Sequence, residues 1–509
     1  MSAGQVNASI LLQELIDALG TKCVLTSPED IYVYSHHGEF ATKRSPPPIA
    51  VIRLSSDEDE KTLAELMKPH DIPVVRRKDR DEPPDPPYLL MDDREPLDRE
   101  ELAKSLSELM EDREQGKRGL KDASSLSQRF VSSIKLLDGQ ILGSLEKPEE
   151  GFCVVHISHG GSEIYSSKGR LLLCRGLLNG ELQPTHKLVD SMYKCTACGQ
   201  CYDQISLEGL EMNNAIIKAR QEITRKGMGP KECAAILGNL REHGNPMGMP
   251  AEDRPLWYED LAEDNRPKEG STLYWTGCTT SYRLPEVVEA TAHVLRQAEL
   301  DFGVMGGEEG CCGLILYLLG LWEDARENAE KVLSDLTARG VKRMTTSCAG
   351  CYYAFTRVYR ALGVHHDIVV EHTSQTFEHL IREGRLHPGP LKETHVWHDP
   401  CDLGRHCGVY RSPRYTLSKI PGLELQEPLL TRDHATCCGG GGGLPLLYEG
   451  TSQEIALQKL TELTSSMPHA VVTACPSCII SLRHASRNQN TKTPIQDISQ
   501  ILKRATAYG

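Results

Sequence analysis

The chain has 509 residues, of which 39% are hydrophobic and 25% are charged, and this length is enough for about three domains of ordinary size. A net charge of −14 argues against nonspecific binding to nucleic acid. The longest apolar candidate, residues 314–322, is far shorter than the roughly 20 residues of a transmembrane helix. The start lacks a basic segment and a small-residue cleavage site, so we expect a cytoplasmic protein.

Residues 1–76 carry alternating helix and strand signals. The signals are an amphipathic start (LLQELIDALG), a capped segment (SPEDIYVYS), a strand (IAVIRLS) and a helix (EDEKTLAELMKPH). They predict a small α/β piece. Residues 77–118 combine prolines with dense charge of both signs, which predicts a linker that leads into a solvated helix.

The chain then changes character twice. Residues 119–270 are expected to be mostly helical, with one cysteine group in YKCTACGQCYDQ. From residue 271 strands alternate with helices, and LYWTGC, VKRMTTSC, THVWHDPC and AVVTAC each end a short apolar run on a cysteine. Helical patterns such as PEVVEATAHVLRQAEL and YEGTSQEIALQKLTEL lie between them. This order predicts parallel βαβ units with sites at the carboxyl ends of the strands.

Eighteen cysteines are hard to explain as disulfides in a reducing compartment, and ten of them form an internal repeat. Each set runs Cys, then a Cys-Cys-Gly group, then a Cys-x-x-Cys pair, and equivalent cysteines are 123 to 127 residues apart. Buried apolar cysteines would share no such spacing. The first set is Cys278, Cys311, Cys312, Cys348 and Cys351, and the second is Cys401, Cys437, Cys438, Cys475 and Cys478.

Five thiolates per set exceed the four ligands of a structural zinc site. Thiolate-rich sites select zinc, copper(I) or iron–sulfur clusters, and a cluster with several irons can use every ligand. The glycine-rich turns GEEGCCG and CCGGGGG would let backbone N–H groups approach cluster sulfurs. A thiolate-rich zinc protein or scaffold would explain the Cys-x-x-Cys pairs but not the repeat of ten cysteines.

At these residues the sequence resembles the CCG-domain proteins, and more narrowly the catalytic subunit of heterodisulfide reductase. TTSCAGCYYAF, WHDPCDLGRHCGVYRSPR and VVTACPSCIISL are similar to the reductase motifs. The resemblance implies two tandem, pseudo-repeated CCG domains, 271–390 and 391–509, in an α/β fold. It also implies two noncubane [4Fe-4S] clusters, bound by the ten cysteines, between which a disulfide is split.

The resemblance continues upstream into a degenerate ferredoxin-like region within residues 119–270. The second ferredoxin motif keeps three cysteines but has Ile205 in place of the fourth. At the first motif only one position is still cysteine. One further [4Fe-4S] or [3Fe-4S] cluster is implied, and the alternative is a decayed module without metal. The candidate ligands are Cys195, Cys198 and Cys201, with Cys153, His156, His159 and Glu163 at the first motif.

Residues 1–76 also resemble the start of FAD-linked 2-hydroxyacid oxidases, through TSPEDIYVYSHHGEF and PPIAVIRLSSDEDEKTLAELMKPHDIPVV. The resemblance stops where the pyrophosphate loop should begin, because RRKDRDEPPDPP contains no glycine. We therefore expect a truncated piece without bound FAD.

Other candidate residues lie around the second set. His398 could deliver a proton to a leaving thiolate, or form a structural hydrogen bond at the strand end. Arg405, Arg411 and Arg414 could bind an anionic substrate or partner, or form a solvated basic face. Cys407 lies outside the repeat and is interpreted as a spare thiol.

The resemblance implies an iron–sulfur oxidoreductase subunit that reduces a disulfide such as CoM-S-S-CoB. The alternative is an electron-transfer subunit of a FAD-linked lactate- or glycolate-type dehydrogenase, which the oxidase-like N-terminus favours. Expected partners are other redox subunits, namely a flavoprotein, a ferredoxin-like protein or a membrane cytochrome, together with a disulfide or thiol substrate. A membrane partner would hold the chain at the cytoplasmic face of the membrane.

Overall fold

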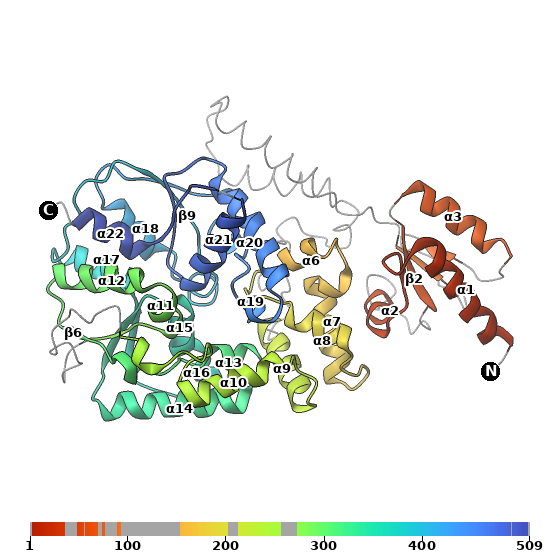
Figure 1. Ribbon diagram of the computed structural model, residues 1–509, viewed down its shortest axis with the longest axis horizontal. Helices are drawn as coiled ribbons and strands as arrows, with labels where there is room; N and C mark the ends of the chain where they lie inside the picture. The colour runs from red at the N-terminus through yellow and green to blue at the C-terminus, as the bar shows by residue number, and fades with distance from the viewer. Residues whose placement is uncertain are drawn as a thin grey trace. The chain divides into compact units, whose positions relative to one another are not determined.

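The computed structural model describes residues 3–35, 48–54, 56–69, 74–76, 89–92, 153–201, 212–255, 272–489 and 491–506. The chain divides into two compact units, Met1–Met192 and Tyr193–Gly509. Helices alternate with strands in three four-stranded sheets, so the expected α/β class is confirmed (Figure 1). Among the described residues, no helix is both long enough and apolar enough to cross a membrane.

The first unit contains a mixed sheet with the strand order β1-β2-β4-β3. β1 is antiparallel to β2, and the other neighbours are parallel. Ser56 caps α3 by accepting a hydrogen bond from the backbone N–H of Asp59, as expected at a helix start. The elements are α1 (Ala3–Leu19), β1 (Val24–Leu25), α2 (Pro28–Ser35), β2 (Ala50–Arg53), α3 (Asp57–Met67), β3 (Val74–Arg76) and β4 (Leu89–Asp92).

Strand β4 lies inside residues 77–118, where the sequence predicted a linker. Leu89, Leu90 and Met91 are buried and pair with both β2 and β3. The sequence did not predict this strand because its short apolar run is flanked by prolines and charged residues. The rest of that stretch lies outside the described residues, as do residues 93–152 and Ile205.

The described parts of residues 119–270 are mostly helical. They contain α6 (Val154–Ser158), η2 (Glu163–Tyr165), α7 (Ser167–Leu178), α8 (His186–Tyr193), α9 (Met212–Arg225), α10 (Glu232–His243) and η3 (Ala251–Asp253).

The second unit contains two sheets with the same arrangement of strands, β6-β5-β7-β8 and β10-β9-β11-β12, in which all neighbours are parallel. The first sheet comprises β5 (Thr272–Trp275), β6 (Phe302–Gly303), β7 (Arg343–Thr346) and β8 (Val369–His372). The second comprises β9 (Thr394–Trp397), β10 (Glu424–Gln426), β11 (Ala470–Thr473) and β12 (Ile495–Asp497).

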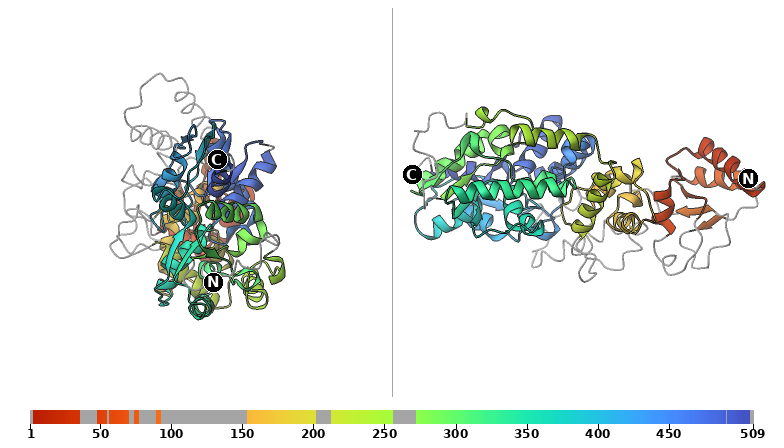
Figure 2. Two further views of the ribbon diagram at one scale, coloured as in Figure 1. Left: turned by 90° about the vertical axis from the view of Figure 1, so that its left-hand side faces the viewer. Right: turned by 90° about the horizontal axis from the view of Figure 1, so that it is seen from below.

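Helices connect these strands and cover the sheets (Figure 2). Around the first sheet they are α11 (Cys278–Arg283), α12 (Pro285–Gln297), η6 (Gly306–Glu308), α13 (Leu314–Leu318), α14 (Trp322–Ala338), α15 (Ala349–Tyr353), η7 (Ala354–Val358), α16 (Tyr359–Ala361) and α17 (Thr373–Arg382). Around the second they are α18 (Arg411–Ser418), η8 (Arg432–His434), α19 (Leu444–Leu447), α20 (Glu449–Thr464), α21 (Pro476–Gln489) and α22 (Ile498–Thr506).

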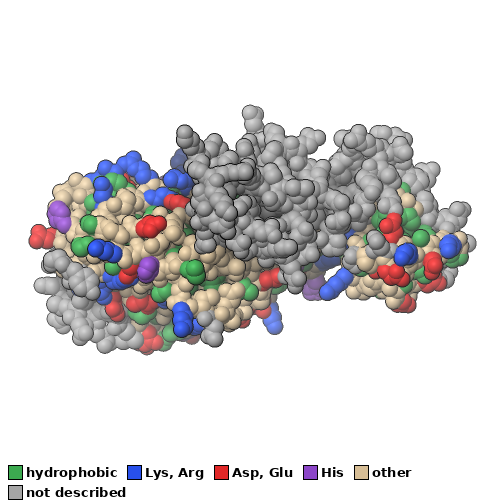
Figure 3. All heavy atoms as spheres, turned by 90° about the horizontal axis from the view of Figure 1, so that it is seen from above, with side chains coloured by type: hydrophobic (Ala, Val, Ile, Leu, Met, Phe, Trp, Pro, Cys, Tyr) green, Lys and Arg blue, Asp and Glu red, His purple; other side chains and the backbone are tan. Residues whose placement is uncertain are grey.

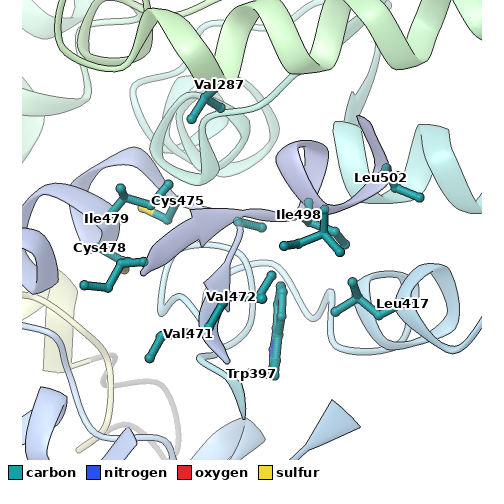
Figure 4. Packing of buried hydrophobic residues seen from close by; sticks show 14 of the residues in the cluster. Val287, Trp397, Leu417, Val471, Val472, Cys475, Cys478, Ile479, Ile498 and Leu502 are labelled. Carbon is teal, nitrogen blue, oxygen red and sulfur yellow. The ribbon is translucent and has the colours of Figure 1, made fainter. Parts of the chain in front are cut away.

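The two sheets share one hydrophobic core. Helix α12 packs against α22, and α11 against α21, while Arg483 of α21 forms an ion pair of 2.6 Å with Glu286 of α12. Buried side chains from both halves, including Val287, Trp397 and Ile498, belong to a single cluster (Figure 4). On the face drawn in Figure 3, basic and acidic side chains both occur on the described surface.

Candidate functional site

The two central strands of each sheet in the second unit lead, at their carboxyl ends, into a cysteine. Cys278 follows β5, Cys348 follows β7, Cys401 follows β9 and Cys475 follows β11. Because β5 is paired in parallel with β7, and β9 with β11, the cysteines that follow them lie at one edge of each sheet. The sequence predicted this placement correctly.

Contacts between thiols link all five cysteines of the first set. Cys278 Sγ lies 3.7 Å from Cys311 Sγ, and Cys351 contacts both Cys312 and Cys348. Hydrogen bonds from Cys311 and then from Cys351 lower the pKa of Cys312 to about 6. A Cβ atom on Gly277 would lie 3.2 Å from Cys351 Sγ, so the backbone closes tightly around these sulfurs.

The second set has the same chain of contacts. Cys438 Sγ lies 3.2 Å from Cys478 Sγ, and Cys478 also contacts Cys475. Hydrogen bonds from Cys198 and Cys401 lower the pKa of Cys437. Cys475 and Cys478 belong to the same hydrophobic cluster as Val471 and Val472 and lie next to Ile479 (Figure 4).

The glycine after each Cys-Cys pair is required by its backbone. Gly313 N–H donates to Cys311 Sγ, and Gly439 N–H donates to Cys437 Sγ, both at 3.4 Å. Their φ angles are 76° and 79°, a region that L side chains rarely adopt. An added Cβ would also lie 2.6 Å from Asn328 Nδ2 in the first case and from Ser452 O in the second.

The two sets face each other. His372, at the end of β8, contacts Ala474 O beside Cys475 at 3.1 Å through Nε2. A Cβ on Gly350, between Cys348 and Cys351, would lie 3.4 Å from Asp402 Oδ2. Asp402 also contacts the neighbouring Cys401, with Sγ and Oδ1 3.7 Å apart. The carboxyl edges of both sheets therefore meet at one place.

A buried ion pair supports the first set. Glu309, two residues before Cys311, pairs with Arg254, and both side chains are almost completely buried. Glu309 accepts hydrogen bonds from the backbone N–H groups of Thr276 (2.9 Å) and Gly277 (2.8 Å). Arg254 donates to Glu309 O and, at 3.2 Å, to Gly310 O. The pair thus fixes the loops that present Cys278 and Cys311.

Arg405 holds the corresponding loop of the second set. Its guanidinium donates to Ala435 O, two residues before Cys437, and to Asp433 O at 3.1 Å. It also donates from Nε to Cys198 O at 2.8 Å. Arg405 was predicted as a candidate for anion binding or as part of a solvated face. In the structure Arg405 instead connects the loop of the second set to the Cys195 segment through these hydrogen bonds.

The segment that carries Cys195, Cys198 and Cys201 packs against the second set. Cys198 shares a hydrogen bond with Cys437, and His406 Nε2 lies 2.9 Å from Ala197 O. Arg220 of α9, which is completely buried, donates to Cys195 O at 2.6 Å and to Gly442 O at 3.0 Å.

The Cys153 group lies in the first unit around α6 and η2. Cys153 begins α6, where Arg170 Nη1 contacts its sulfur at 3.4 Å. His156 Nδ1 lies 3.0 Å from Ser162 O, and His159 Nδ1 lies 3.0 Å from Val155 O. Glu163 is buried and accepts a hydrogen bond from Ser166 Oγ at 2.9 Å. Shared metal binding by these residues stays a prediction.

His398 lies beside the thiols of the second set. One of its ring nitrogens is within 4.8 Å of both Cys438 Sγ and Cys478 Sγ, and Nδ1 has no hydrogen-bond partner among the described residues. Its backbone N–H donates to Val472 O at 2.9 Å. Burial lowers its pKa to about 3, so the imidazole is neutral at pH 7 and a poor source of protons.

The other candidate residues near the second set are Arg414, Arg411 and Cys407. Arg414 forms ion pairs with Asp399 (2.7 Å) and Glu427 (2.6 Å), so it serves the fold, whereas the Arg411 side chain is 76% exposed. Burial raises the pKa of Cys407 to about 12, which fits a spare thiol and excludes a low-pKa nucleophile.

The donor set fits a group that binds through several thiolates. None of the eighteen cysteines, all of which lie in the described residues, forms a disulfide. Five sulfurs per set, mostly buried and in mutual contact, exceed what one tetrahedral zinc ion uses. The sequence missed Arg254, Glu309, Asp402 and Arg220 in this arrangement. Glu309 and Asp402 carried a signal, because they lie in the motifs GEEGCCG and WHDPCDLGRHCGVYRSPR.

Comparison with protein families agrees with this geometry. Residues 272–356 and 395–483 each match the family described as CCG, cysteine-rich domain. The chain is thus a protein with two CCG domains, and each domain supplies one set of five cysteines.

Among curated proteins, the chain is similar to a subunit of the dihydromethanophenazine:CoB–CoM heterodisulfide reductase from Methanosarcina barkeri. The two are 27% identical over 377 residues, covering 70% of this chain and 91% of that protein. A probable iron–sulfur-binding oxidoreductase, FadF, of Bacillus subtilis is 27% identical (62% of this chain, 46% of that protein). The EtfAB:quinone oxidoreductase of Syntrophomonas wolfei is 28% identical (62% and 46%).

A solved structure of a hypothetical protein from Helicobacter pylori shares the fold. The TM-score is 0.50 at 10% identity, with 81% of this chain and 79% of that chain covered.

Proposed function

We propose that the chain is an iron–sulfur oxidoreductase subunit that reduces a disulfide at two noncubane [4Fe-4S] clusters. One cluster would be bound by each set of five cysteines. The observation that carries this proposal is that two complete sets of contacting thiols lie where the carboxyl edges of the two sheets meet. The similarity to the heterodisulfide reductase of Methanosarcina barkeri supports it.

When bound, such clusters supply single electrons and iron sites for thiolates. The residues of this chain contribute the ligands, the burial and the spacing. Glycines at 277, 313 and 439 let the backbone approach the sulfurs. Asp402 lies between Cys401 and Gly350, where both halves of a cleaved disulfide would be held.

The Cys195 group would hold a third cluster. It lies beside the second set, which it contacts through Cys198 and Cys437 and through the hydrogen bonds of Arg220 to Cys195 and Gly442. The resemblance of residues 1–76 to the start of FAD-linked 2-hydroxyacid oxidases stays a prediction. Partners would be other redox subunits, which the similarity to the EtfAB:quinone oxidoreductase supports.

Titration of the oxidised, anaerobically prepared protein with thiols tests the function. Coenzyme M or coenzyme B, added without any partner chain, should alter the paramagnetic resonance signal, and reduced viologen should drive cleavage of the mixed disulfide. Replacing Cys401 with Ser should abolish both effects, whereas Cys407→Ser, six residues away but outside the set, should leave them. If no thiol alters the signal, the electron-transfer alternative replaces the reductase function.

A further inference from the structure

The charges beside the two cysteine sets differ at one matched position. Arg254 donates to the carbonyl of Glu309, two residues before the first Cys-Cys pair, and Arg405 donates to the carbonyl of Ala435, two residues before the second. Each set therefore has one guanidinium at the same loop. The residue that carries the contacted carbonyl is an acid in the first set and an alanine in the second.

Glu309 neutralises Arg254. The two form a buried ion pair, and the carboxylate also accepts from the two backbone N–H groups just before Cys278. Burial lowers the pKa of Arg254, and Glu309, followed by the Cys278 thiolate, raises it by more. The net charge contributed by this pair to the first set is close to zero.

Arg405 has no such partner. Its hydrogen bonds go to the three carbonyls of Cys198, Asp433 and Ala435, and it forms no ion pair with a carboxylate of the described residues. Burial lowers the pKa of Arg405, and the thiolates of Cys198, Cys401 and Cys437 outweigh this effect, so the pKa is raised. The charge that balances Arg405 is thus mainly that of the sulfurs themselves.

Asp402 interacts electrostatically with Arg405 and offsets its charge only in part, because the two side chains form no ion pair within the described residues. Its carboxyl group contacts Cys401 Sγ at 3.7 Å on one side. On the other side it lies 3.4 Å from where a Cβ of Gly350 would be, within the first set. Because the carboxyl group lies between the sets, its charge acts on both.

We propose that the second cysteine set holds its cluster at a higher reduction potential than the first, because Arg405 lacks the carboxylate that neutralises Arg254. The inference rests on the proposed function, since it requires a cluster in each set. Reduction adds negative charge, and a nearby unbalanced cation in a low-dielectric site stabilises that charge. Electrons that enter this chain then reside at the second set, where the Cys195 segment is attached, before the first.

The experiment is an anaerobic redox titration of the full chain, followed by paramagnetic resonance. Cys348→Ala and Cys475→Ala, each of which removes one cluster, assign the signals. Arg405→Gln removes the unbalanced charge and should lower the potential of the second cluster but not that of the first. Glu309→Gln, which keeps the shape of the side chain, should raise the potential of the first cluster only.

Each shift should change the ratio of reduced to oxidised cluster about tenfold at a fixed potential, which is about 59 mV for a one-electron couple. Arg411→Gln is the matched control, because it removes a cation whose side chain is 76% exposed, and neither potential should move. Arg405→Lys, which keeps the charge, should recover most of the potential of the second cluster.

Clusters that are present but keep their potentials in both Gln variants would overturn this inference and leave the proposed function standing. If Arg405→Gln loses its second cluster, Glu309→Gln decides alone, and an unchanged first potential would overturn the inference. Protein that holds zinc and no iron or sulfide would overturn the inference and the proposed function together.

Discussion

Arg220 joins three parts of the second unit, and its replacement by Met should destabilise that unit strongly. The side chain is completely buried and donates to Leu318 O at 2.5 Å, Cys195 O at 2.6 Å and Gly442 O at 3.0 Å. A hydrogen bond to a charged group contributes roughly 1.5–3 kcal/mol. Loss of three such bonds, offset by the removal of a buried charge, should cost about 3 kcal/mol or more.

The assay is anaerobic urea denaturation followed by circular dichroism, with iron content measured on the folded protein. Arg225→Met, on the same helix, is the control. Arg225 is 69% exposed and its pair with Glu222 spans 3.7 Å, so the change should cost less than about 1 kcal/mol. Iron bound by the Cys195 group should be lost in Arg220→Met before iron bound by the CCG domains. Equal unfolding free energies in the two variants would refute the reasoning.

Three further outcomes follow from the structure. Cys348→Ala or Cys475→Ala should each remove about four of the eight irons expected in two four-iron clusters, and loss of all eight without unfolding would show that the sets share one site. Gly320→Ala should lower the free energy of unfolding by about 2 kcal/mol or more, because φ is 79° and a Cβ would lie 2.5 Å from the Arg220 backbone. The control in calorimetry is Gly363→Ala, which has a similar φ but open space around it, so it shows the cost of the backbone conformation without the steric clash. Burial lowers the pKa of His372 in the folded protein to about 4, below the pKa near 6.5 of a histidine in the unfolded chain. The free energy of unfolding should therefore fall by up to about 3 kcal/mol as the pH drops from 6.5 to 4, because the unfolded state takes up the proton first. His372→Gln should flatten this pH dependence in denaturation curves taken across that range.

The gathering of the ten cysteines at strand ends could be predicted from the sequence because its signals are local. A short apolar run that ends on Cys278 or Cys475 fixes the residue at a strand end, and the parallel order of strands brings such ends to one edge. The helices at 285–297 and 449–464 were also predicted, with ends that differ by no more than three residues. Strand β4 was missed because a three-residue apolar run gives too short a period for assignment.

The charges around the sets could not be predicted, because each contact joins residues that are distant in the chain. Arg254 and Glu309 are 55 residues apart, and Arg405 and Cys198 are 207 apart. An arginine in a polar segment has the same local pattern whether it is solvated or buried. Only the fold places Arg405 beside the thiols, pairs Arg414 with two acids and leaves Arg411 exposed to solvent.

The glycine run after Cys438 has a second physical cause besides the one the sequence indicated. Gly439 N–H does donate to a cysteine sulfur, as expected for a turn around a cluster. Gly441 and Gly442, however, face the other cysteine segment: an added Cβ would lie 2.8 Å from Thr196 O in the first case and 2.5 Å from Cys195 O in the second. Any side chain there would force the two backbones apart. The run therefore serves both to enclose the second set and to seat the Cys195 segment beside it, which is why Cys198 can reach Cys437.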